Sequence, residues 1–331
     1  MDLFALTRRL IDIESTTPNE SMVGDFLHKE LQRRGWDAQK LPVEGARANV
    51  LGTSPGHARP AIVFSTHMDT VPPFFASSED DARIYGRGAC DAKGIIAAQI
   101  VAAEKLCAAG VFVGLLFLVG EERDSIGAKV ANQHPIGARF MINGEPTDNR
   151  LAVATKGALH VELIARGKMA HSAYPELGES AIDKLVEVLH RLHMMKLPEI
   201  ADVGPCTKNV GLIQGGRAPN VISDFAKAEL FYRLVGPTEE LRRAITEAAG
   251  DLAEVHFTRE SPFMRLWTLD GMPTMVAAFT TDIPSLGNWG EPLLLGPGSI
   301  RVAHTEGESV TKQELMEAVE LYCSVARRLG V

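Results

Sequence analysis

The segment from Val111 to Val119 (VFVGLLFLV) constrains the fold more than any other part of the chain. It contains no polar residue, so a strand formed there has no side that can face solvent. Strands of this kind lie in largely parallel sheets that are covered by helices on both faces. The flanking sequence agrees, because Ala61–Thr66 (AIVFST) and Arg139–Asn143 (RFMIN) predict further strands and Gly94–Ala109 predicts an alanine-rich helix. The chain is therefore predicted to contain an α/β domain.

Helices are predicted near both ends of the chain. Apolar residues recur at helical spacing over residues 3–13, which predicts an amphipathic helix. Thr17-Pro18-Asn19-Glu20 then predicts the start of a second helix, with a threonine cap, a proline in the first turn and a glutamate three residues after the cap. Thr311 and Glu314 predict a capping box for a last helix that runs to Arg328.

A second domain is predicted to interrupt the first. Between residues 157 and 266 the pattern changes to strands and helices in the order βαββαβ, which is typical of a small ferredoxin-like α+β unit. After this unit, residues 270–281 are predicted to return to helix and residues 292–295 to strand. Residues 1–156 and 267–331 are therefore predicted to form one domain, and residues 157–266 an inserted one.

Composition excludes several classes of protein. The net charge is −8 and no run of lysine or arginine occurs, which argues against a nucleic-acid partner. The four cysteines are far apart and form no C-x-x-C pair, which argues against a thiolate zinc site or a disulfide framework. The N-terminus lacks the profile of a signal peptide, and the longest uncharged run, residues 106–120, is too short to span a membrane. We therefore expect a cytoplasmic protein.

Residues that could bind a metal follow the predicted strands. His67 and Asp69 lie two positions apart directly after a strand, so both side chains point the same way and the carboxylate can orient the imidazole. Glu121 and Glu122 follow the apolar segment, and their side chains point in different directions, so that one can hold a metal while the other faces a water. In an α/β sheet such residues gather beyond the carboxyl ends of the strands.

Taken together, the histidines and carboxylates after predicted strands form a candidate ligand set, whose members are His67, Asp91, Glu122, Glu145 and His304. Nitrogen and carboxylate donors without thiolate suit Zn²⁺, Co²⁺ or Mn²⁺, and a set of this size suits two ions that share one carboxylate. Taken singly, each residue is equally consistent with an ordinary surface position. The glycine-rich segment 86–94 lacks the spacing of a phosphate-binding loop, which disfavours a nucleotide site.

Several sequence blocks occur in an order that resembles the M20 family of metallopeptidases and amidohydrolases. The blocks are STHMDTVP, YGRGACDAKG, VGEERDSIGA, NGEPT, HSAYPELGESAI, GGRAPNVISD and GPGSIRVAHTEGE. The branch that they resemble most is that of acetylornithine deacetylase and succinyl-diaminopimelate desuccinylase. The resemblance covers nearly the whole chain. It implies a catalytic domain with a mixed sheet flanked by helices, interrupted by a ferredoxin-like domain that serves as a lid and for dimerisation.

The resemblance also implies a role for each candidate ligand. His67 and Glu145 would hold one metal ion, Glu122 and His304 would hold the other, and Asp91 would bridge both. The metal pair would be Zn²⁺, with Co²⁺ or Mn²⁺ as alternatives. A cis peptide bond between Asp91 and Ala92 is a further expectation from the resemblance.

Other site residues are implied in the same way. Glu121 would be the general base, Asp69 would tune His67, and His171 of the inserted domain would stabilise the oxyanion. Four residues are expected to bind substrate: Asn220, Arg233, Gly298 and Ser299.

The function implied is removal of the acyl group from a small N-acyl amino acid, with N-acetylornithine as the leading substrate. Succinyl-diaminopimelate desuccinylase, another N-acyl-amino-acid deacylase and a di- or carboxypeptidase remain alternatives within the family. A non-catalytic metal- or ligand-binding relative is disfavoured, because the base and the ligands are all present. A nicotinamide-dependent dehydrogenase is disfavoured because no G-x-G-x-x-G follows the first strand. A homodimer through the inserted domain is the expected assembly.

Overall fold

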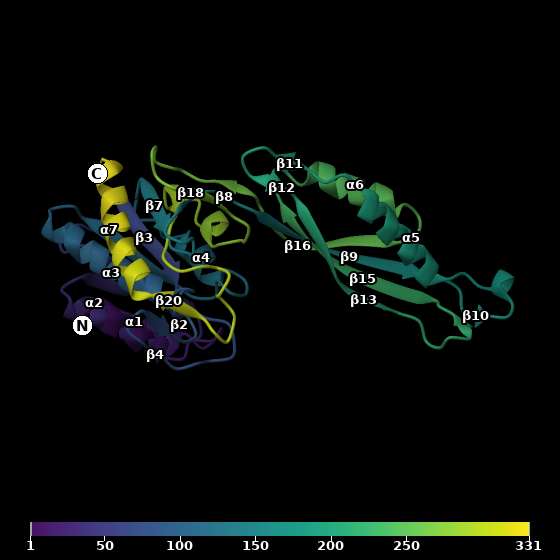
Figure 1. Cartoon of the computed structure of the whole chain (residues 1–331), viewed down its shortest axis with the longest axis horizontal. Helices are drawn as coiled ribbons and strands as arrows, with labels where there is room; N and C mark the ends of the chain where they lie inside the picture. The colour runs from purple at the N-terminus through teal and green to yellow at the C-terminus, as the bar shows by residue number, and fades with distance from the viewer. Residues whose placement is uncertain (1, 331) are drawn as a thin grey trace. The chain divides into compact units, whose positions relative to one another are not determined.

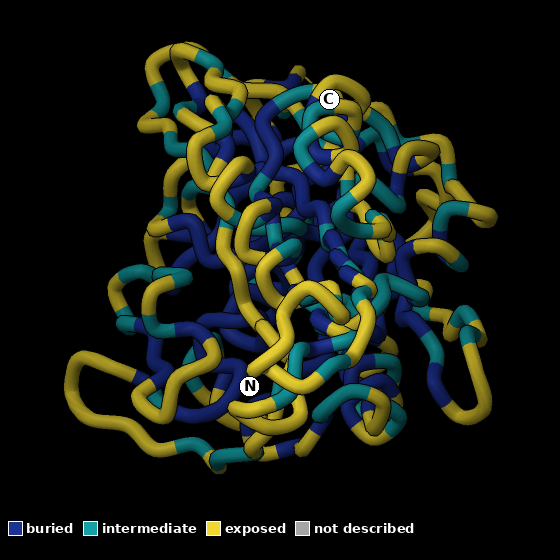
Figure 2. The backbone as a smooth tube through the Cα atoms, turned by 90° about the vertical axis from the view of Figure 1, so that its right-hand side faces the viewer, coloured by how far each residue is buried: buried dark blue, intermediate teal, exposed yellow. Residues whose placement is uncertain are grey.

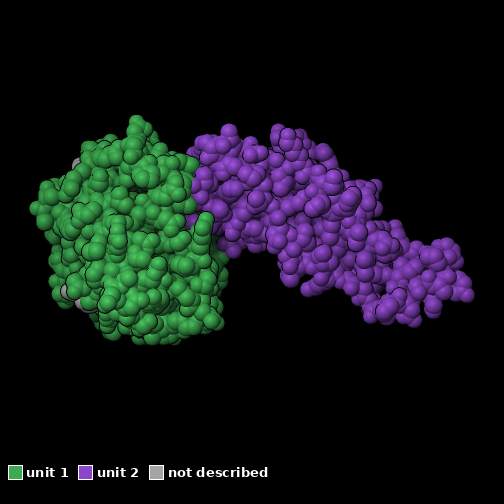
Figure 3. All heavy atoms as spheres, viewed as in Figure 1, with its two compact units in different colours: residues 1–153, 266–275, 281–331 green, residues 154–265, 276–280 purple. Residues whose placement is uncertain are grey.

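In a computed structural model that describes residues 2–330, the apolar segment forms strand β6 (Val113–Leu118), all of whose residues are buried. The chain divides into two compact units, coloured separately in Figure 3. Unit 1 comprises Met1–Val153, Leu266–Met275 and Thr281–Val331. Unit 2 comprises Ala154–Arg265 and also the short segment Val276–Thr280. Unit 1 is therefore built from sequence on both sides of unit 2.

Strand β6 lies in a six-stranded sheet of unit 1, of which Figure 1 labels strands β2, β3 and β7. In spatial order the strands are β1 (Asp37–Glu44), β2 (Arg47–Thr53), β6, β3 (Ile62–His67), β7 (Phe140–Asn143) and β19 (Glu291–Leu294). The pairs β1–β2 and β2–β6 are antiparallel, whereas β6–β3, β3–β7 and β7–β19 are parallel. The predicted mixed sheet is thereby confirmed, and the carboxyl ends of β3, β6, β7 and β19 meet at one edge.

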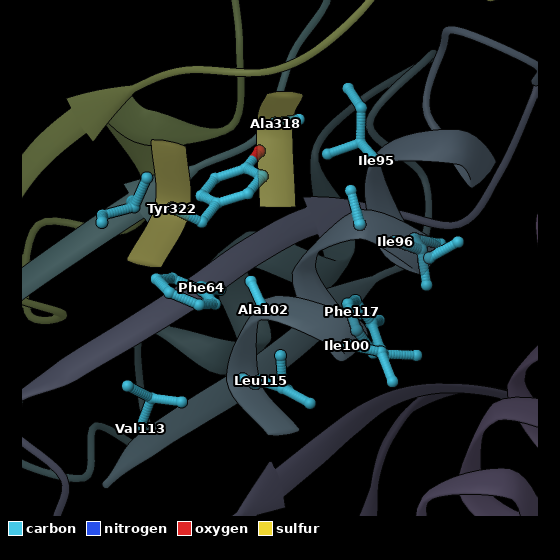
Figure 4. Close-up of a cluster of buried hydrophobic side chains, with 14 of the residues drawn as sticks. Phe64, Ile95, Ile96, Ile100, Ala102, Val113, Leu115, Phe117, Ala318 and Tyr322 are labelled. Carbon is cyan, nitrogen blue, oxygen red and sulfur yellow. The ribbon is translucent and has the colours of Figure 1, made fainter. Parts of the chain in front are cut away.

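Helices cover this sheet and bury its apolar side chains. They are α1 (Leu3–Ile11), α2 (Ser21–Arg33), α3 (Lys93–Ala108), α4 (Ile126–Ala131) and α7 (Lys312–Arg328). Figure 4 shows Ile96 and Ile100 of α3 and Tyr322 of α7 beside Phe64 and Leu115 of the sheet. Helix α3 is buried along most of its length because it lies between the sheet and both terminal helices, α1 and α7. Figure 2 marks the buried residues along the chain.

The start of α2 differs from the prediction. The helix begins at Ser21, not at Thr17, and Thr17 does not cap it. The Thr17 hydroxyl instead donates a hydrogen bond to Asp69 Oδ2 at 2.6 Å. Glu20, the expected capping-box glutamate, is fully buried in an ion pair with Arg47 at 2.7 Å. The local pattern was misleading because both side chains are used in tertiary contacts.

The helix predicted over residues 270–281 is also wrong. This segment contains strand β18 (Thr274–Ala277), which joins β8 (Leu151–Thr155) and β17 (Met264–Arg265) in a small sheet. Gly271 has φ of +74° and Pro273 follows it, and both residues interrupt a helix. The remaining short elements of unit 1 are β4 (Ser78–Glu79), β5 (Arg83–Tyr85), β20 (Ser309–Thr311) and η2 (Ile283–Ser285).

Unit 2 has the predicted ferredoxin-like arrangement of four antiparallel strands and two helices. Its elements in chain order are β9 (Gly157–Arg166), α5 (Ala181–Met194), β13 (Thr207–Gly215), β15 (Phe225–Leu234), α6 (Glu239–Ala249) and β16 (Glu254–Ser261). The strand order is β13-β15-β9-β16. Alternate residues of β15 are buried, which is the pattern of a sheet with helices on one face. Shorter elements of the unit include β10 (Ala170–His171), η1 (Pro175–Leu177), β11 (Glu199–Ile200), β12 (Gly204–Pro205) and β14 (Val221–Ile222).

The capping box predicted for the last helix is present. The Thr311 hydroxyl accepts the Glu314 N–H at 2.9 Å, and the Glu314 side chain accepts the Thr311 N–H at 2.9 Å. None of the helices in the described part of the chain combines the length and the apolarity that crossing a bilayer requires.

Candidate metal centre

The candidate ligands come from loops at the carboxyl edge of the unit 1 sheet. His67 is the last residue of β3, and Glu122 and Glu145 lie in the loops that follow β6 and β7. Asp91 lies just before α3, and His304 lies in the long loop between β19 and β20. Parallel neighbours end at the same edge of a sheet, which explains why side chains from distant sequence positions converge there.

Asp91 is the centre of this cluster. Its Oδ1 lies 2.9 Å from His67 Nε2, and its Oδ2 lies 3.2 Å from His304 Nε2. His304 Nε2 also lies 3.0 Å from Glu122 Oε1. Ligand atoms of His67, Asp91 and Glu122 all lie within 4.8 Å of one another. Two ions can share a carboxylate when each oxygen has its own neighbouring ligand. Here each Asp91 oxygen has a histidine beside it.

The electrostatics of the cluster also fit a cation. Burial, together with the charge of Glu145, raises the pKa of Glu121 well above its ordinary value, and burial does the same for Glu145. Glu145 Oε1 is buried and has no hydrogen-bond partner among residues 2–330. Buried carboxylates that crowd together are costly unless a positive charge offsets them. A pair of divalent ions would supply that charge, so the residues fit the metals that the sequence predicts.

The two histidines respond to the same carboxylates. Burial alone would lower the pKa of His67, but hydrogen bonds to Asp69 and Asp91 raise it well above its ordinary value. Hydrogen bonds to Asp91 and Glu122 raise the pKa of His304 to about 10. The same histidines hold the pKa of Asp91 below its usual range in spite of its burial. Metal ligation uses neutral imidazole, so a bound cation would displace these protons.

Asp69 contacts the residues of the cluster through hydrogen bonds. It is fully buried, and its two oxygens accept the backbone N–H groups of Glu121 and Glu122 at 3.1 and 3.2 Å. His67 Nδ1 lies 3.0 Å from the Asp69 carbonyl oxygen and 3.6 Å from Oδ1, so the closer hydrogen bond is to the backbone. Asp69 therefore positions the loop after β6 as well as the ring of His67.

Glu121 and Glu122 have different surroundings, although they are adjacent. Glu122 accepts a hydrogen bond from His304. No hydrogen bond or ion pair occupies the Glu121 carboxylate in the described chain, although it is buried enough to have a raised pKa. One side chain is thus committed to the cluster, while the other remains free to accept a proton.

The backbone around the cluster is unusual at two places. His304 has φ of 63°, a left-handed conformation that residues other than glycine seldom adopt. The peptide bond between Asp91 and Ala92 is cis, which confirms that expectation.

Gly298 and Ser299 lie in the loop after β19 in unit 1. Gly298 has φ of +81°, and a Cβ atom there would lie 2.5 Å from Cys90 Cβ, so only glycine fits against Cys90. Ser299 forms an isolated bridge with Thr147, in the loop after β7. The structure therefore brings this loop to the segments that carry Asp91 and Glu145. A contact with substrate remains a prediction for both residues.

The other predicted residues, His171, Asn220 and Arg233, belong to unit 2. His171 lies in β10 and is exposed. The N–H of Ser172, the residue after His171, donates to the Asn220 carbonyl at 3.0 Å, so the structure brings His171 and Asn220 together. Arg233 lies on β15 with its guanidinium 4.5 Å from the ring centroid of Phe231. Burial lowers the pKa of Arg233, and within residues 2–330 no carboxylate pairs with it. Their roles at the site remain predictions.

Sequence reasoning missed three charged side chains in unit 1. Asp282 is 1 % exposed, burial raises its pKa to about 7, and neither carboxylate oxygen has a hydrogen-bond partner among the residues that the structure describes. Lys93 is fully buried, its Nζ donates to the Ile13 carbonyl at 2.6 Å, and burial lowers its pKa to about 7. Glu308 is 1 % exposed. In the sequence, Lys93 directly precedes a predicted helix, Asp282 directly follows another, and Glu308 lies four residues after the predicted ligand His304. These positions were the only signal.

Comparison with known proteins agrees with this geometry. The model of peptidase family M20/M25/M40 matches residues 63–328 of the chain. A peptidase M20 domain-containing protein of Schizosaccharomyces pombe is 38 % identical over 336 residues, which cover 97 % of this chain and 83 % of that protein. A probable carboxypeptidase of Aspergillus clavatus is 36 % identical over 365 residues, covering 97 % of this chain and 81 % of the relative. The chain therefore belongs to the M20/M25/M40 peptidase family.

Solved structures show the same fold. Aminopeptidase PepT of Bacillus cereus superposes with a TM-score of 0.84 at 21 % identity, covering 99 % of this chain and 98 % of that one. YXEP of Bacillus subtilis, described as a dinuclear metal binding peptidase of the M20 family, gives a TM-score of 0.71 at 16 % identity, covering 99 % and 97 %. With its family established, the protein is a metal-dependent hydrolase of amide bonds that acts on small peptide or amino-acid substrates.

Proposed function

We propose that the chain is a carboxypeptidase of short peptides, which releases an amino acid with a free α-carboxylate. The observation that carries amide hydrolysis is the cluster around Asp91, with His67 and His304 at its two oxygens and the unpaired Glu121 beside it. Similarity to probable carboxypeptidases along 97 % of the chain supports the choice of substrate. The cytoplasmic location inferred from the sequence stays a prediction.

Deacetylation of N-acetylornithine is the second candidate, and the sequence blocks favour it. An N-acyl amino acid and the last residue of a peptide share one chemical unit, an amide whose nitrogen belongs to an amino acid with a free carboxylate. The two candidates differ only in the group on the other side of the carbonyl. The same catalytic residues therefore serve both, and the acyl-side pocket decides between them.

We assign the ligands as the resemblance implies: His67 and Glu145 would hold one Zn²⁺, Glu122 and His304 the other, and Asp91 both. When bound, the ions would supply Lewis acidity, which lowers the pKa of a water and polarises the scissile carbonyl. Co²⁺ and Mn²⁺ suit the same donors.

The residues of the chain then carry out the proton transfers. Glu121 removes a proton from the attacking water, whose oxygen forms a bond to the carbonyl carbon. As the carbon–nitrogen bond breaks, Glu121 returns that proton to the leaving amine. Asp69 keeps Glu121 in place by accepting its backbone N–H at 3.1 Å. We assign His171 to the developing negative charge on the carbonyl oxygen.

Arg233 is the proposed partner of the substrate carboxylate. Its guanidinium is half-buried and stacked on Phe231, which fixes its plane, and no carboxylate of the described chain neutralises it. A planar guanidinium is well suited to bind a carboxylate through two parallel hydrogen bonds. We assign Asn220, Gly298 and Ser299 to the same end of the substrate.

A panel of blocked substrates tests this proposal. The Zn²⁺-loaded protein is incubated with tripeptides that are either acetylated at the N-terminus or amidated at the C-terminus, and with N-acetyl, N-succinyl and N-formyl amino acids. We expect cleavage of the acetylated tripeptides, loss of the C-terminal residue, and no cleavage of the amidated ones. Cleavage of the amidated peptides with release of the N-terminal residue would contradict the proposal. Turnover of N-acetylornithine alone would select the second candidate.

A further inference from the structure

Glu308 is a buried carboxylate that the proposed reaction does not use. It lies four residues after His304, directly before β20, and is 1 % exposed. Glu306, two residues earlier in the same loop, is exposed. A buried carboxylate is costly unless several donors satisfy it, so its partners should reveal why it is there.

The Glu308 side chain binds the backbone of the segment that leads to Asp91. Its Oε1 accepts the N–H groups of Gly88, Cys90 and Asp91 at 2.9, 3.3 and 3.2 Å. All three residues are buried, so these N–H groups would otherwise lack an acceptor. The turn depends on Gly88, which has φ of +89°, and its N–H groups converge on one point as in an anion-binding nest.

Two further contacts tie Glu308 to the same segment. Its Oε2 accepts a hydrogen bond from the Arg87 guanidinium at 2.5 Å, so the charge of the carboxylate is offset within the loop. Its backbone carbonyl accepts the Gly86 N–H at 3.1 Å. Arg87 is itself held, because its Nε donates to the Pro73 carbonyl at 3.2 Å. Residues 86–91 are therefore attached to Glu308 through both its side chain and its backbone.

This attachment joins two ligand-bearing loops. Asp91 ends one loop, His304 lies four residues before Glu308 in the other, and their side chains meet at 3.2 Å. We propose that Glu308 is a positioning residue that fixes Asp91 relative to His304 and thereby sets the affinity for the divalent ion they share. The proposal rests on the metal site of the proposed function but not on the identity of the substrate.

Metal affinity of the substrate-free protein tests this. Zn²⁺ is titrated into apo-protein in competition with a chromophoric chelator, for the unchanged chain and for Glu308→Ala and Glu308→Gln. We expect Glu308→Ala to bind the ion shared by Asp91 and His304 about 10–100-fold less tightly, as when partners that orient metal ligands are removed. Glu308→Gln should show a smaller loss, since its amide oxygen can still accept the N–H groups but cannot neutralise Arg87. Saturating Zn²⁺ should restore most of kcat in both variants.

Glu306→Gln is the matched control and should bind Zn²⁺ as the unchanged chain does. Circular dichroism establishes that each variant is folded. An affinity of Glu308→Gln equal to that of the unchanged chain overturns the proposal, whether or not Glu308→Ala folds. A kcat that stays low at saturating Zn²⁺ also overturns it, because a positioning residue acts through the metal. The Zn²⁺ affinity is measured without substrate, so it tests the role of Glu308 even if the substrate assignment fails.

Discussion

Glu121 and Glu122 are neighbouring carboxylates with different surroundings, which predicts different roles. Glu122 is bound to His304, whereas Glu121 is half-buried and unpaired among the described residues. We predict that Glu121→Gln lowers kcat by ~10²–10⁴-fold, as expected for loss of a general base, and leaves metal content unchanged. Glu122→Gln should instead weaken the binding of one ion. Steady-state kinetics with elemental analysis checks both, and equal metal content in the two variants would show the division of roles to be wrong.

The donors around Asp91 predict two ions per chain. Asp91 offers one oxygen to each side, with His67 and His304 beyond them. We expect apo-protein titrated with Zn²⁺ to gain full activity only at two equivalents, with an intermediate plateau if the sites differ in affinity. Full activity at one equivalent would contradict the shared-carboxylate arrangement. Activity and bound metal are measured on the same samples.

His171 carries the prediction for unit 2. It is exposed, and its Nδ1 accepts the Ala173 N–H at 3.1 Å, which leaves Nε2 available as a donor. We expect His171→Ala to lower kcat by ~10²–10³-fold, the usual effect of losing one oxyanion donor, with metal binding unchanged. His193→Ala, at another exposed histidine of unit 2, is the control. A fully active His171→Ala variant would remove His171 from the mechanism.

At the scale of elements, a sequence pattern predicted a helix end correctly where the side chains of the pattern bond to each other. The capping box of α7 was predicted because Thr311 and Glu314 need only each other. The start of α2 was not, because Thr17 bonds to Asp69, fifty-two positions away. Strand β1 escaped prediction because four of its eight residues, DAQKLPVE, are polar, and its pairing with β2 is what makes it a strand.

The same distinction applies to the candidate site. His67, Glu122 and Glu145 were found because each follows a strong strand signal. The partnership of Glu308 with Gly88 joins positions 220 residues apart, which no local pattern encodes. Asp282 was missed for a related reason, since the segment before it was predicted as helix and is strand β18.

The end of α2 offers a prediction about stability and pH. Glu30 accepts hydrogen bonds from Arg33 and Arg34, and Arg34 also bonds Glu104 of α3 at 2.8 Å. The hydrogen bond from Arg33, with that from Arg34, lowers the pKa of Glu30 to about 2 in spite of its burial. Because the folded pKa lies below the ordinary value, this stabilisation is fully present above about pH 4.5 and is lost as the pH falls toward 2.

We therefore expect Glu30→Gln to lower the free energy of unfolding at pH 7 by about 1–3 kcal/mol. The difference in the free energy of unfolding between Glu30→Gln and the unchanged chain should become smaller below about pH 4.5. Urea unfolding at pH 7, 5 and 4 measures it, with Glu317→Gln, at an exposed position of α7, as the control. A difference that grows on acidification would show that Glu30 does not act as an ionised partner.

At the scale of the whole molecule, strand β13 predicts an assembly. Among residues 2–330 it pairs only with β15, and its other edge leaves backbone groups available for pairing. Val210, Leu212 and Ile213 are 40, 53 and 62 % exposed on it. An exposed apolar edge strand is a template for a second strand, and a two-fold dimer of this chain would cover it. We predict a dimer in solution, and Leu212→Lys should shift it to monomer in analytical ultracentrifugation.

Complementation distinguishes whether dimerisation also serves catalysis. If His171 acts in the partner's site, mixing His171→Ala with Glu121→Gln subunits should restore part of the activity. Absence of recovery from a mixture that forms mixed dimers would show that His171 acts within its own chain. A monomeric protein at micromolar concentration would contradict the dimer itself.

The order of segments along unit 1 determines when an active centre can first exist. Strands β3, β6 and β7 precede unit 2, whereas β19, the neighbour of β7, and the proposed ligand His304 follow it. On the ribosome, the early strands and four of the five proposed donors emerge while the last donor has not been translated. A nascent chain thus has no complete centre, however well its first half has folded. If all five donors are needed for activity, the timing of translation keeps unfinished copies from hydrolysing the peptides around them.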